Sequence, residues 1–230
     1  MICHPFQCIF VHVPKTAGQS IEQFFMDRLG LDWNNDRDQM LLQNNTDPAL
    51  GTEKLAHLSA SEYIDCGHIS QEQFSSYFKF GFVRNPWTRL LSEYRYRNYF
   101  HHHSFKNFVL HKMPKPGWDD KYRHIMPQHD LLYDTNGHCL VDFIGRFETL
   151  QRDFDHVCRE IGIEDSTLPH RNRSDKKSRD LKRKFRNILF MNGENSHQTL
   201  TDFYDDETRE AVADFYRIDI ETFGYEFPPH

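Results

Sequence analysis

The sequence predicts an α/β fold in which a mostly parallel β-sheet is flanked by α-helices. Strand-like runs are twice followed by a turn and an amphipathic helix, an alternation that is typical of parallel sheets covered on both faces. The length of 230 residues suits a single domain, residues 1–230, and 38% of the residues are hydrophobic, enough for a substantial core. Both strand-like runs end in polar turns, at the sheet edge where such folds bind ligands.

The first strand, turn and helix are expected near the N-terminus. Residues 7–13 (QCIFVHV) are mostly β-branched and aromatic and stop at Pro14, as expected of a buried strand entering a turn. Apolar residues then recur at helical spacing from Gly18 to Leu29, and Gly30 closes this predicted helix. Residues 33–52 are rich in Asn, Asp and Gln and predict a loop without catalytic groups.

The same pattern recurs in the middle of the chain. Residues 79–83 (KFGFV) predict a buried strand that ends at Arg84. Asn85 can cap the following helix and Pro86 can occupy its first turn, so we expect a helix that runs to about Phe100. The remaining predicted elements are a third strand over 141–147, a helix over 148–161 and a helical C-terminus over 205–225.

Charge and cysteine content exclude several classes of protein. The formal net charge of −6 argues against a general nucleic-acid binder, although residues 171–186 carry nine Lys or Arg against two acids and predict a solvated basic segment. No apolar run approaches the roughly 20 residues that span a bilayer, so we expect no membrane insertion. Five scattered cysteines without a CxxC pair predict reduced thiols in the cytoplasm.

The first turn has the composition of an anion-binding loop. Small residues at Ala17 and Gly18 allow the backbone to approach a phosphate closely, Lys15 supplies a positive charge, and the helix N-terminus adds N–H groups and its dipole. Thr16 and Ser20 offer hydroxyl groups to the same ligand. The candidate anion-binding residues of this loop are Lys15, Thr16, Ala17, Gly18, Gln19 and Ser20.

This loop is P-loop-like but differs from the loop of nucleotide kinases. A kinase loop reads GxxxxGK[ST], with the lysine after the second glycine and beside a hydroxyl that holds Mg²⁺. Here Lys15 precedes Gly18, and the second strand ends in Arg84 where a metal-holding aspartate would stand. We therefore expect the loop to bind its anion without a metal.

The second turn, FVRNPWTRLLS, places a guanidinium at a strand end and a hydroxyl in the following helix. Arg84 can meet a phosphate dianion with paired N–H donors. Ser92 follows Arg89 by three residues, so both project from one helix face and Ser92 can add a neutral hydrogen bond. Together the two turns predict a ligand that carries phosphate groups at both ends.

These motifs resemble those of sulfotransferases that use 3′-phosphoadenosine 5′-phosphosulfate (PAPS). The strand-PKTAG-S-helix and strand-RNPxxRLxS-helix turns are similar to those of the bacterial and Golgi-type carbohydrate branch, which includes heparan sulfate 2-O-sulfotransferase. The resemblance extends to VDFIGRFETLQRDF, LPHRNRS and the C-terminal YDDETREAVADFYRIDIETFGY, and so covers most of the chain outside residues 31–52. It implies the sulfotransferase fold.

The resemblance also implies roles for individual residues. Residues Lys15–Ser20 would hold the 5′-phosphosulfate, and Lys15 would also stabilise charge on the leaving oxygen as PAP departs. Arg84 and Ser92 would hold the 3′-phosphate, and Ser174 would lie near the nucleotide. PAPS is then the co-substrate and PAP the product, no metal is required, and the acceptor is a hydroxyl group, expected on a carbohydrate.

A general base must remove the proton of the acceptor hydroxyl, and two of the 15 histidines are candidates. His57 opens AHLSASE, which resembles the His-Leu-Ser/Thr-Ala segment of bacterial relatives. His68 lies in GHIS, which resembles the Gly-His-Val-Ser of the heparan enzyme. The longer similarity favours His57, but the sequence leaves both open.

Other features leave alternatives open. The run His101–His103 and the pair His124 and His129 suggest metal ligands, but consecutive helical residues point in different directions and chelate poorly. A P-loop-like kinase or a module that binds PAP without turnover would share the loops. The segment Phe100–Tyr133 is the expected acceptor-facing insertion. A cytoplasmic bacterial enzyme is expected, with a trimmed Golgi luminal domain as the alternative.

Overall fold

The computed structural model describes residues 1–169 and 199–229, which form two compact units. The first, the sheet unit, comprises Met1–Arg84 and Pro114–Leu168. The second, the helical unit, comprises Asn85–Met113 and the described residues after Leu168. That the whole chain makes a single domain stays a prediction. The basic segment 171–186 and Ser174 lie outside the described residues.

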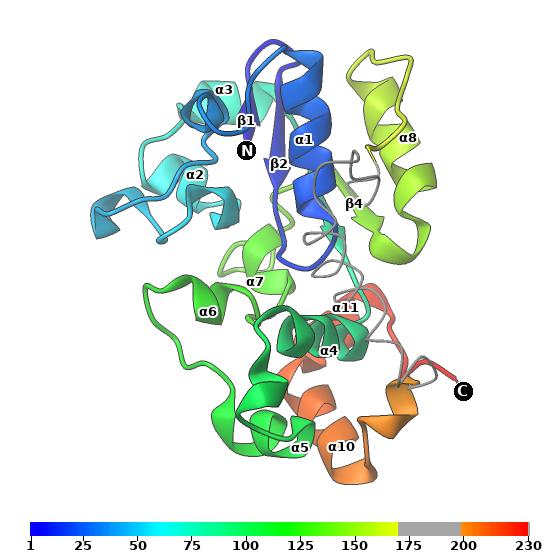
Figure 1. Cartoon of the computed structure of the whole chain (residues 1–230). Helices are drawn as coiled ribbons and strands as arrows, with labels where there is room; N and C mark the ends of the chain where they lie inside the picture. The colour runs from blue at the N-terminus through cyan, green and yellow to red at the C-terminus, as the bar shows by residue number, and fades with distance from the viewer. Residues whose placement is uncertain (170–198, 230) are drawn as a thin grey trace, which may run out of the picture. The chain divides into compact units, whose positions relative to one another are not determined.

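The sheet unit is built on one four-stranded sheet in the order β1-β2-β3-β4 (Figure 1). Its strands are β1 (Ile2–Cys3), β2 (Cys8–Val11), β3 (Phe78–Val83) and β4 (Phe143–Arg146). β2, β3 and β4 are parallel, and β1 pairs with β2 in antiparallel fashion. The α/β fold with a mostly parallel sheet is therefore confirmed. Strand β1 was not predicted, because a strand of two residues has no readable periodicity.

Two long helices cover one face of this sheet, and both were predicted. They are α1 (Gly18–Arg28) and α8 (Leu150–Glu160), and the rings of Phe24 and Phe154 join them edge to face at 4.9 Å. Phe10 of β2 and Phe80 of β3 stack at 5.1 Å beneath them. These fully or nearly fully buried aromatic rings form the centre of the core.

The opposite face of the sheet carries shorter elements. The methyl group of an alanine at Gly81 would come within 2.7 Å of Leu132 Cδ2, so this glycine lets α7 approach β3 closely. The backbone N–H of Ala60 donates to the carbonyl of Leu131. The short helices of the unit are α2 (Glu62–Asp65), α3 (Gln71–Ser76), α6 (Asp120–Arg123) and α7 (His129–Leu132), with 3₁₀ turns at Arg37–Met40, Pro48–Leu50, Leu55–His57 and Phe147–Thr149.

The helical unit contains α4 (Pro86–Tyr96), α10 (Asp206–Phe215) and α11 (Arg217–Phe223). As predicted, the Asn85 side chain caps α4 by accepting the Thr88 N–H, and Pro86 stands in its first turn. α4 ends four residues earlier than expected, and Asn98 beyond it adopts a left-handed φ of 56°. The predicted C-terminal helix is divided at Tyr216, and the other elements are α5 (Phe105–Asn107), a π-helical turn (Phe108–Lys112) and 3₁₀ turns at Tyr99–His101 and Leu200–Asp202.

Buried polar groups hold the helical unit together. Arg89 is fully buried, and its guanidinium lies 5.8 Å from the ring centroid of Tyr216. The Trp87 indole donates to the carbonyl of Arg209, which ties α4 to α10. Within residues 1–169 and 199–229, none of the helices has both the length and the apolar character needed to cross a membrane.

Candidate active site

The loop between β2 and α1 has a backbone shaped to receive an anion. Lys15 and Ala17 both adopt left-handed conformations, with φ of 74° and 69°. Left-handed residues next to right-handed ones turn successive N–H groups toward one concavity. Ala17 is the N-cap of α1, its methyl group cannot accept a hydrogen bond, and the first turn of the helix contains no acidic residue. The dipole of this 11-residue helix could therefore favour an anion at its N-terminus without a competing carboxylate in the first turn.

The side chains of the predicted loop have different environments. The Thr16 hydroxyl is fully buried and donates to the carbonyl of Val13 at 2.8 Å, so its hydrogen secures the turn. Lys15 and Ser20 are half-buried and Gln19 is exposed. Lys15, Gln19 and Ser20 thus remain within reach of solvent beside the N-terminus of α1.

The glycine of the loop is required by a histidine that lies behind it. The methyl group of an alanine at Gly18 would come within 2.1 Å of His12 Nε2. His12 is 5% exposed, and its Nδ1 lies 2.6 Å from Glu22 Oε1, a carboxylate that is also buried. Burial acts to raise the pKa of Glu22, but the nearby His12 outweighs it, so the pKa lies below its ordinary value. Sequence reasoning missed this pair because His12 was counted only as a strand residue.

The structure brings Arg84 to the same loop. Its Nη1 donates to the carbonyl of Lys15 at 3.1 Å, and its guanidinium lies 4.2 Å from the ring centroid of Phe147. The backbone N–H of Arg84 donates to the side-chain oxygen of Gln128, and the side-chain amide of Gln128 donates to the backbone carbonyl of Arg84. These two hydrogen bonds fix the backbone at the end of β3. A cation is thus held rigidly beside Lys15 at the end of β3.

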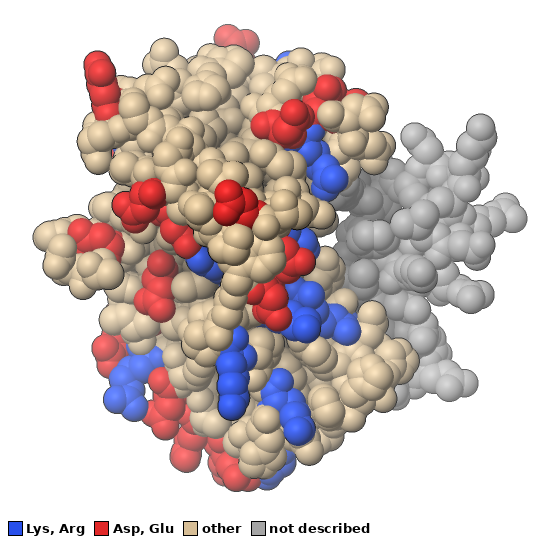
Figure 2. Space-filling model, turned by 90° about the vertical axis from the view of Figure 1, so that its left-hand side faces the viewer, with Lys and Arg blue, Asp and Glu red and all other residues tan. Residues whose placement is uncertain are grey.

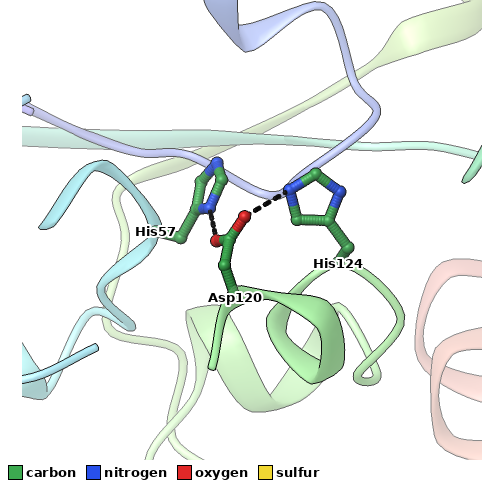
Figure 3. A group of neighbouring side chains, drawn as sticks. All are labelled: His57, Asp120 and His124. Atoms are coloured by element: carbon green, nitrogen blue, oxygen red, sulfur yellow. Dashed lines mark hydrogen bonds and ion pairs between the residues drawn. The ribbon is translucent and has the colours of Figure 1, made fainter. Parts of the chain in front are cut away.

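His57 belongs to a buried cluster of polar side chains (Figure 3). Its Nδ1 lies 2.5 Å from Asp120 Oδ1. The second oxygen of Asp120 lies 3.1 Å from His124 Nε2 and 2.9 Å from Lys54 Nζ. His57 comes from the 3₁₀ turn after Lys54, whereas Asp120 and His124 come from the beginning and end of α6.

Burial and hydrogen bonding shift the pKa values of this cluster. Burial lowers the pKa of His57 to about 4, against the opposing hydrogen bond with Asp120. For Asp120, burial acts to raise the pKa, but hydrogen bonds with His124 and His57 outweigh it and hold the pKa well below its usual range. At neutral pH His57 is therefore uncharged and able to accept a proton, while Asp120 is ionised.

One short path of contacts joins His57 to the loop. The rings of His57 and His12 meet edge to face with centroids 4.9 Å apart, and the same His12 ring packs against Gly18. His68, the other candidate base, is half-buried and lies within 2.8 Å of the Leu50 carbonyl through its Nε2. Of the two histidines, the described contacts bring only His57 to the loop.

Two further residues, Ser92 and Ser174, were predicted to bind the nucleotide. Ser92 stands on α4 in the helical unit, is half-buried, and its hydroxyl has no hydrogen-bond partner among the described residues. Ser174 is outside the part of the chain that the structure describes. Their placement at the 3′-phosphate and near the nucleotide stays a prediction.

The cluster also has the composition of a metal site. One ligand atom each of His57, Asp120 and His124 can be chosen so that all lie within 4.8 Å of one another. However, the Lys54 ammonium contacts the same carboxylate at 2.9 Å and would oppose a divalent cation there. The arrangement fits a hydrogen-bonded network better than a metal centre, and sequence reasoning had considered His124 only as a partner of His129.

Comparison with known proteins agrees with the α/β fold of the chain. The model of the sulfotransferase family matches residues 1–226, and the chain belongs to this family. An uncharacterized protein of Archaeoglobus fulgidus is 33% identical over 98 residues, which cover 41% of this chain and 76% of that protein. No solved structure matches the sequence. The family supports transfer of a sulfuryl group, and it does not distinguish among acceptors.

Proposed function

We propose that this protein transfers the sulfuryl group of PAPS to an acceptor hydroxyl, with His57 as the general base. The acceptor oxygen forms a bond to sulfur as the bridging S–O bond breaks, and PAP leaves with the electron pair. The observation that carries this proposal is the contact path from Gly18 through His12 to His57, because it joins the anion loop to an uncharged histidine.

The nucleotide would be held by the two predicted turns. Lys15 and the N–H groups at the start of α1 suit the 5′-phosphosulfate, and Lys15 would stabilise charge that grows on the leaving oxygen. Arg84, which stacks on Phe147 beside Lys15, suits the 3′-phosphate. Ser92 would complete the 3′-phosphate site and Ser174 would lie near the nucleotide. None of these contacts requires a metal.

We propose a carbohydrate as the acceptor. The segment Phe100–Tyr133 spans both units, and within the sheet unit it presents Trp118, which is 41% exposed. The Trp118 indole is anchored by a hydrogen bond of 2.7 Å to the carbonyl of Gly51, and the residue stands two positions before Asp120. A fixed aromatic ring with an exposed face suits the apolar face of a sugar, and it would lie near the base.

The remaining assignments concern partners and compartment. On the face drawn in Figure 2, Lys and Arg side chains are interspersed with Asp and Glu, which together with the net charge of −6 argues against a nucleic-acid partner. All five cysteines lie in the described part of the chain and are free thiols, which supports a reducing compartment such as the cytoplasm.

The test is turnover of PAPS with a panel of sugars and simple alcohols, in the presence of excess EDTA. Wild-type protein should release PAP only with a hydroxyl acceptor, and PAP alone should raise the melting temperature, since a ligand of the native state stabilises it. Stabilisation by ATP and Mg²⁺ but not by PAP would indicate the kinase alternative. Binding of PAP without turnover of any acceptor would indicate a nucleotide-binding module.

The choice of base is tested with a matched pair of variants. His57→Ala should lose about 10² to 10⁴ in rate and keep its affinity for PAP, because the imidazole need not touch the nucleotide. His68→Ala, at a histidine whose Nε2 lies against a backbone carbonyl, should retain most of the activity. The reverse pattern would assign the base to His68, and full activity in both variants would place the proton on another group.

A further inference from the structure

We propose that Asp120 is the positioning residue of the base: its carboxylate holds His57 in the tautomer that carries the proton on Nδ1 and leaves Nε2 able to accept one. This inference rests on the proposed function, since it names what prepares His57 for the reaction. Sequence motifs do not point to Asp120, which lies 63 residues after His57 and outside both strand-turn-helix motifs.

The geometry around Nδ1 supports this tautomer. Nδ1 of His57 and Oδ1 of Asp120 are 2.5 Å apart, which requires a proton between them. A neutral imidazole carries one proton, so a proton on Nδ1 leaves a lone pair on Nε2. His57 is 6% exposed and Asp120 is 3% exposed, so water competes little for either group.

The proton between the two groups belongs to the imidazole because the carboxylate is held in its ionised form. Its second oxygen is contacted by Lys54 Nζ at 2.9 Å and by His124 Nε2 at 3.1 Å. Burial acts to raise the pKa of Asp120, but its contacts with His124 and His57 outweigh burial and hold the pKa well below its usual range. An ionised carboxylate can only accept hydrogen bonds, so His57 must be the donor.

The position of Asp120 is also fixed through its backbone. Its N–H donates to the Glu53 carboxylate at 3.0 Å at the start of α6, and the neighbouring Asp119 caps the helix by accepting the Lys121 N–H. These bonds anchor the backbone that carries the carboxylate, and the Lys54 contact holds its second oxygen. This rigidity sets the direction of the ring as well as its tautomer.

The other nitrogen of His57 is directed away from Asp120 (Figure 3). In residues 1–169 and 199–229 the structure gives Nε2 no hydrogen-bond partner, and the ring edge meets His12, which packs against Gly18 of the loop. Nε2 is thus the nitrogen available for the acceptor proton. Once it takes that proton, the imidazolium remains paired with the Asp120 carboxylate until the proton is released to solvent.

The direct test is the tautomer of His57 in the wild-type protein, read from ¹⁵N chemical shifts of the imidazole at pH 7. We expect a protonated Nδ1 and an unprotonated Nε2. Asp120→Asn should reverse this pattern, since the amide group can donate to Nδ1 and leave the proton on Nε2. A wild-type signal with the proton on Nε2 would overturn the proposal without any assay of activity.

Kinetics provide the second test. Asp120→Asn should lower kcat by about 10² to 10⁴ and leave the affinity for PAP within about threefold, because the base is then in the wrong tautomer. Asp119→Asn is the matched control: it makes the same substitution one residue earlier, asparagine still caps α6, and Asp119 does not contact His57. Its activity should stay within about threefold of wild type.

A double variant separates positioning from a structural role. If Asp120 acts through His57, Asp120→Asn should lower the rate very little in a His57→Ala background. An equal further loss in that background would overturn the proposal and indicate a structural role for the Lys54 and His124 contacts. Full activity of Asp120→Asn with an inactive His57→Ala would overturn it while the proposed function stands, and an active His57→Ala would defeat the proposed function itself.

Discussion

Replacing Gly18 by alanine would force a methyl group onto the ring of His12. The added Cβ would stand 2.1 Å from Nε2, whereas ordinary contact begins near 3.4 Å, so the ring would have to retreat by 3.4 − 2.1 = 1.3 Å. The ring has little room for this movement, since it stacks on Phe10, meets the edge of His57 and is bonded to Glu22 at 2.6 Å. Either the loop must deform or the hydrogen bond between His12 and Glu22 must break.

The expected cost follows from these two effects. Overpacking of a rigid site costs about 1–3 kcal/mol, and a buried carboxylate that loses a charge-assisted hydrogen bond costs about 1.5–3 kcal/mol. We expect a loss of about 3 kcal/mol in the free energy of unfolding of Gly18→Ala. In a protein of this length each kcal/mol changes the melting temperature by about 2–4 °C, so the variant should melt about 6–12 °C below wild type.

Thermal and urea unfolding measure this loss, with Gly117→Ala as the control. At Gly117 the added methyl group would meet nothing closer than 3.9 Å, so its melting temperature should be unchanged. His12→Asn removes the part of the ring that collides with the methyl group and keeps an N–H donor for Glu22. The double variant His12→Asn/Gly18→Ala should therefore cost less than the sum of the single changes. A Gly18→Ala variant as stable as wild type would refute the packing argument.

Three further predictions follow from the site. Arg84→Ala should weaken PAP about tenfold to a hundredfold by calorimetry but leave adenosine 5′-phosphosulfate nearly unaffected, because only PAP has the 3′-phosphate; equal losses would place Arg84 elsewhere. Excess EDTA should leave turnover unchanged, since Lys54 stands against the Asp120 carboxylate; loss of activity that Zn²⁺ restores would reveal a metal centre. The unfolded state takes up a proton on His57 near pH 6.5 while burial lowers its folded pKa to about 4, so the stability should decline as the pH falls through this window. Urea unfolding at several pH values should show this slope, weaker in His57→Gln, and an unchanged slope in that variant would contradict the assignment.

Local patterns were enough to predict the three parallel strands, the long helices and the two turns of this fold. The strand-to-helix turn at Lys15–Ser20 is encoded by residues adjacent in sequence, and so are the Asn85 cap and the Pro86 start of α4. Such features depend on the conformational preferences of a few neighbouring residues, so they can be read along the chain. Two features were not predicted because local patterns do not show them. Strand β1 is too short to show a period, and the apolar repeat of the C-terminal helix continues through its division at Tyr216.

The relations among the polar groups were decided by tertiary structure alone. The motifs favoured His57 but left His68 open as the base, and only the folded chain shows that His57 meets Asp120, 63 residues away, while His68 meets the Leu50 carbonyl. The role of Gly18 likewise depends on the ring of His12, which sequence reasoning took for an ordinary strand residue. Burial and hydrogen bonding between residues distant in sequence determine tautomers and pKa values, and no local pattern records which distant group will be the partner.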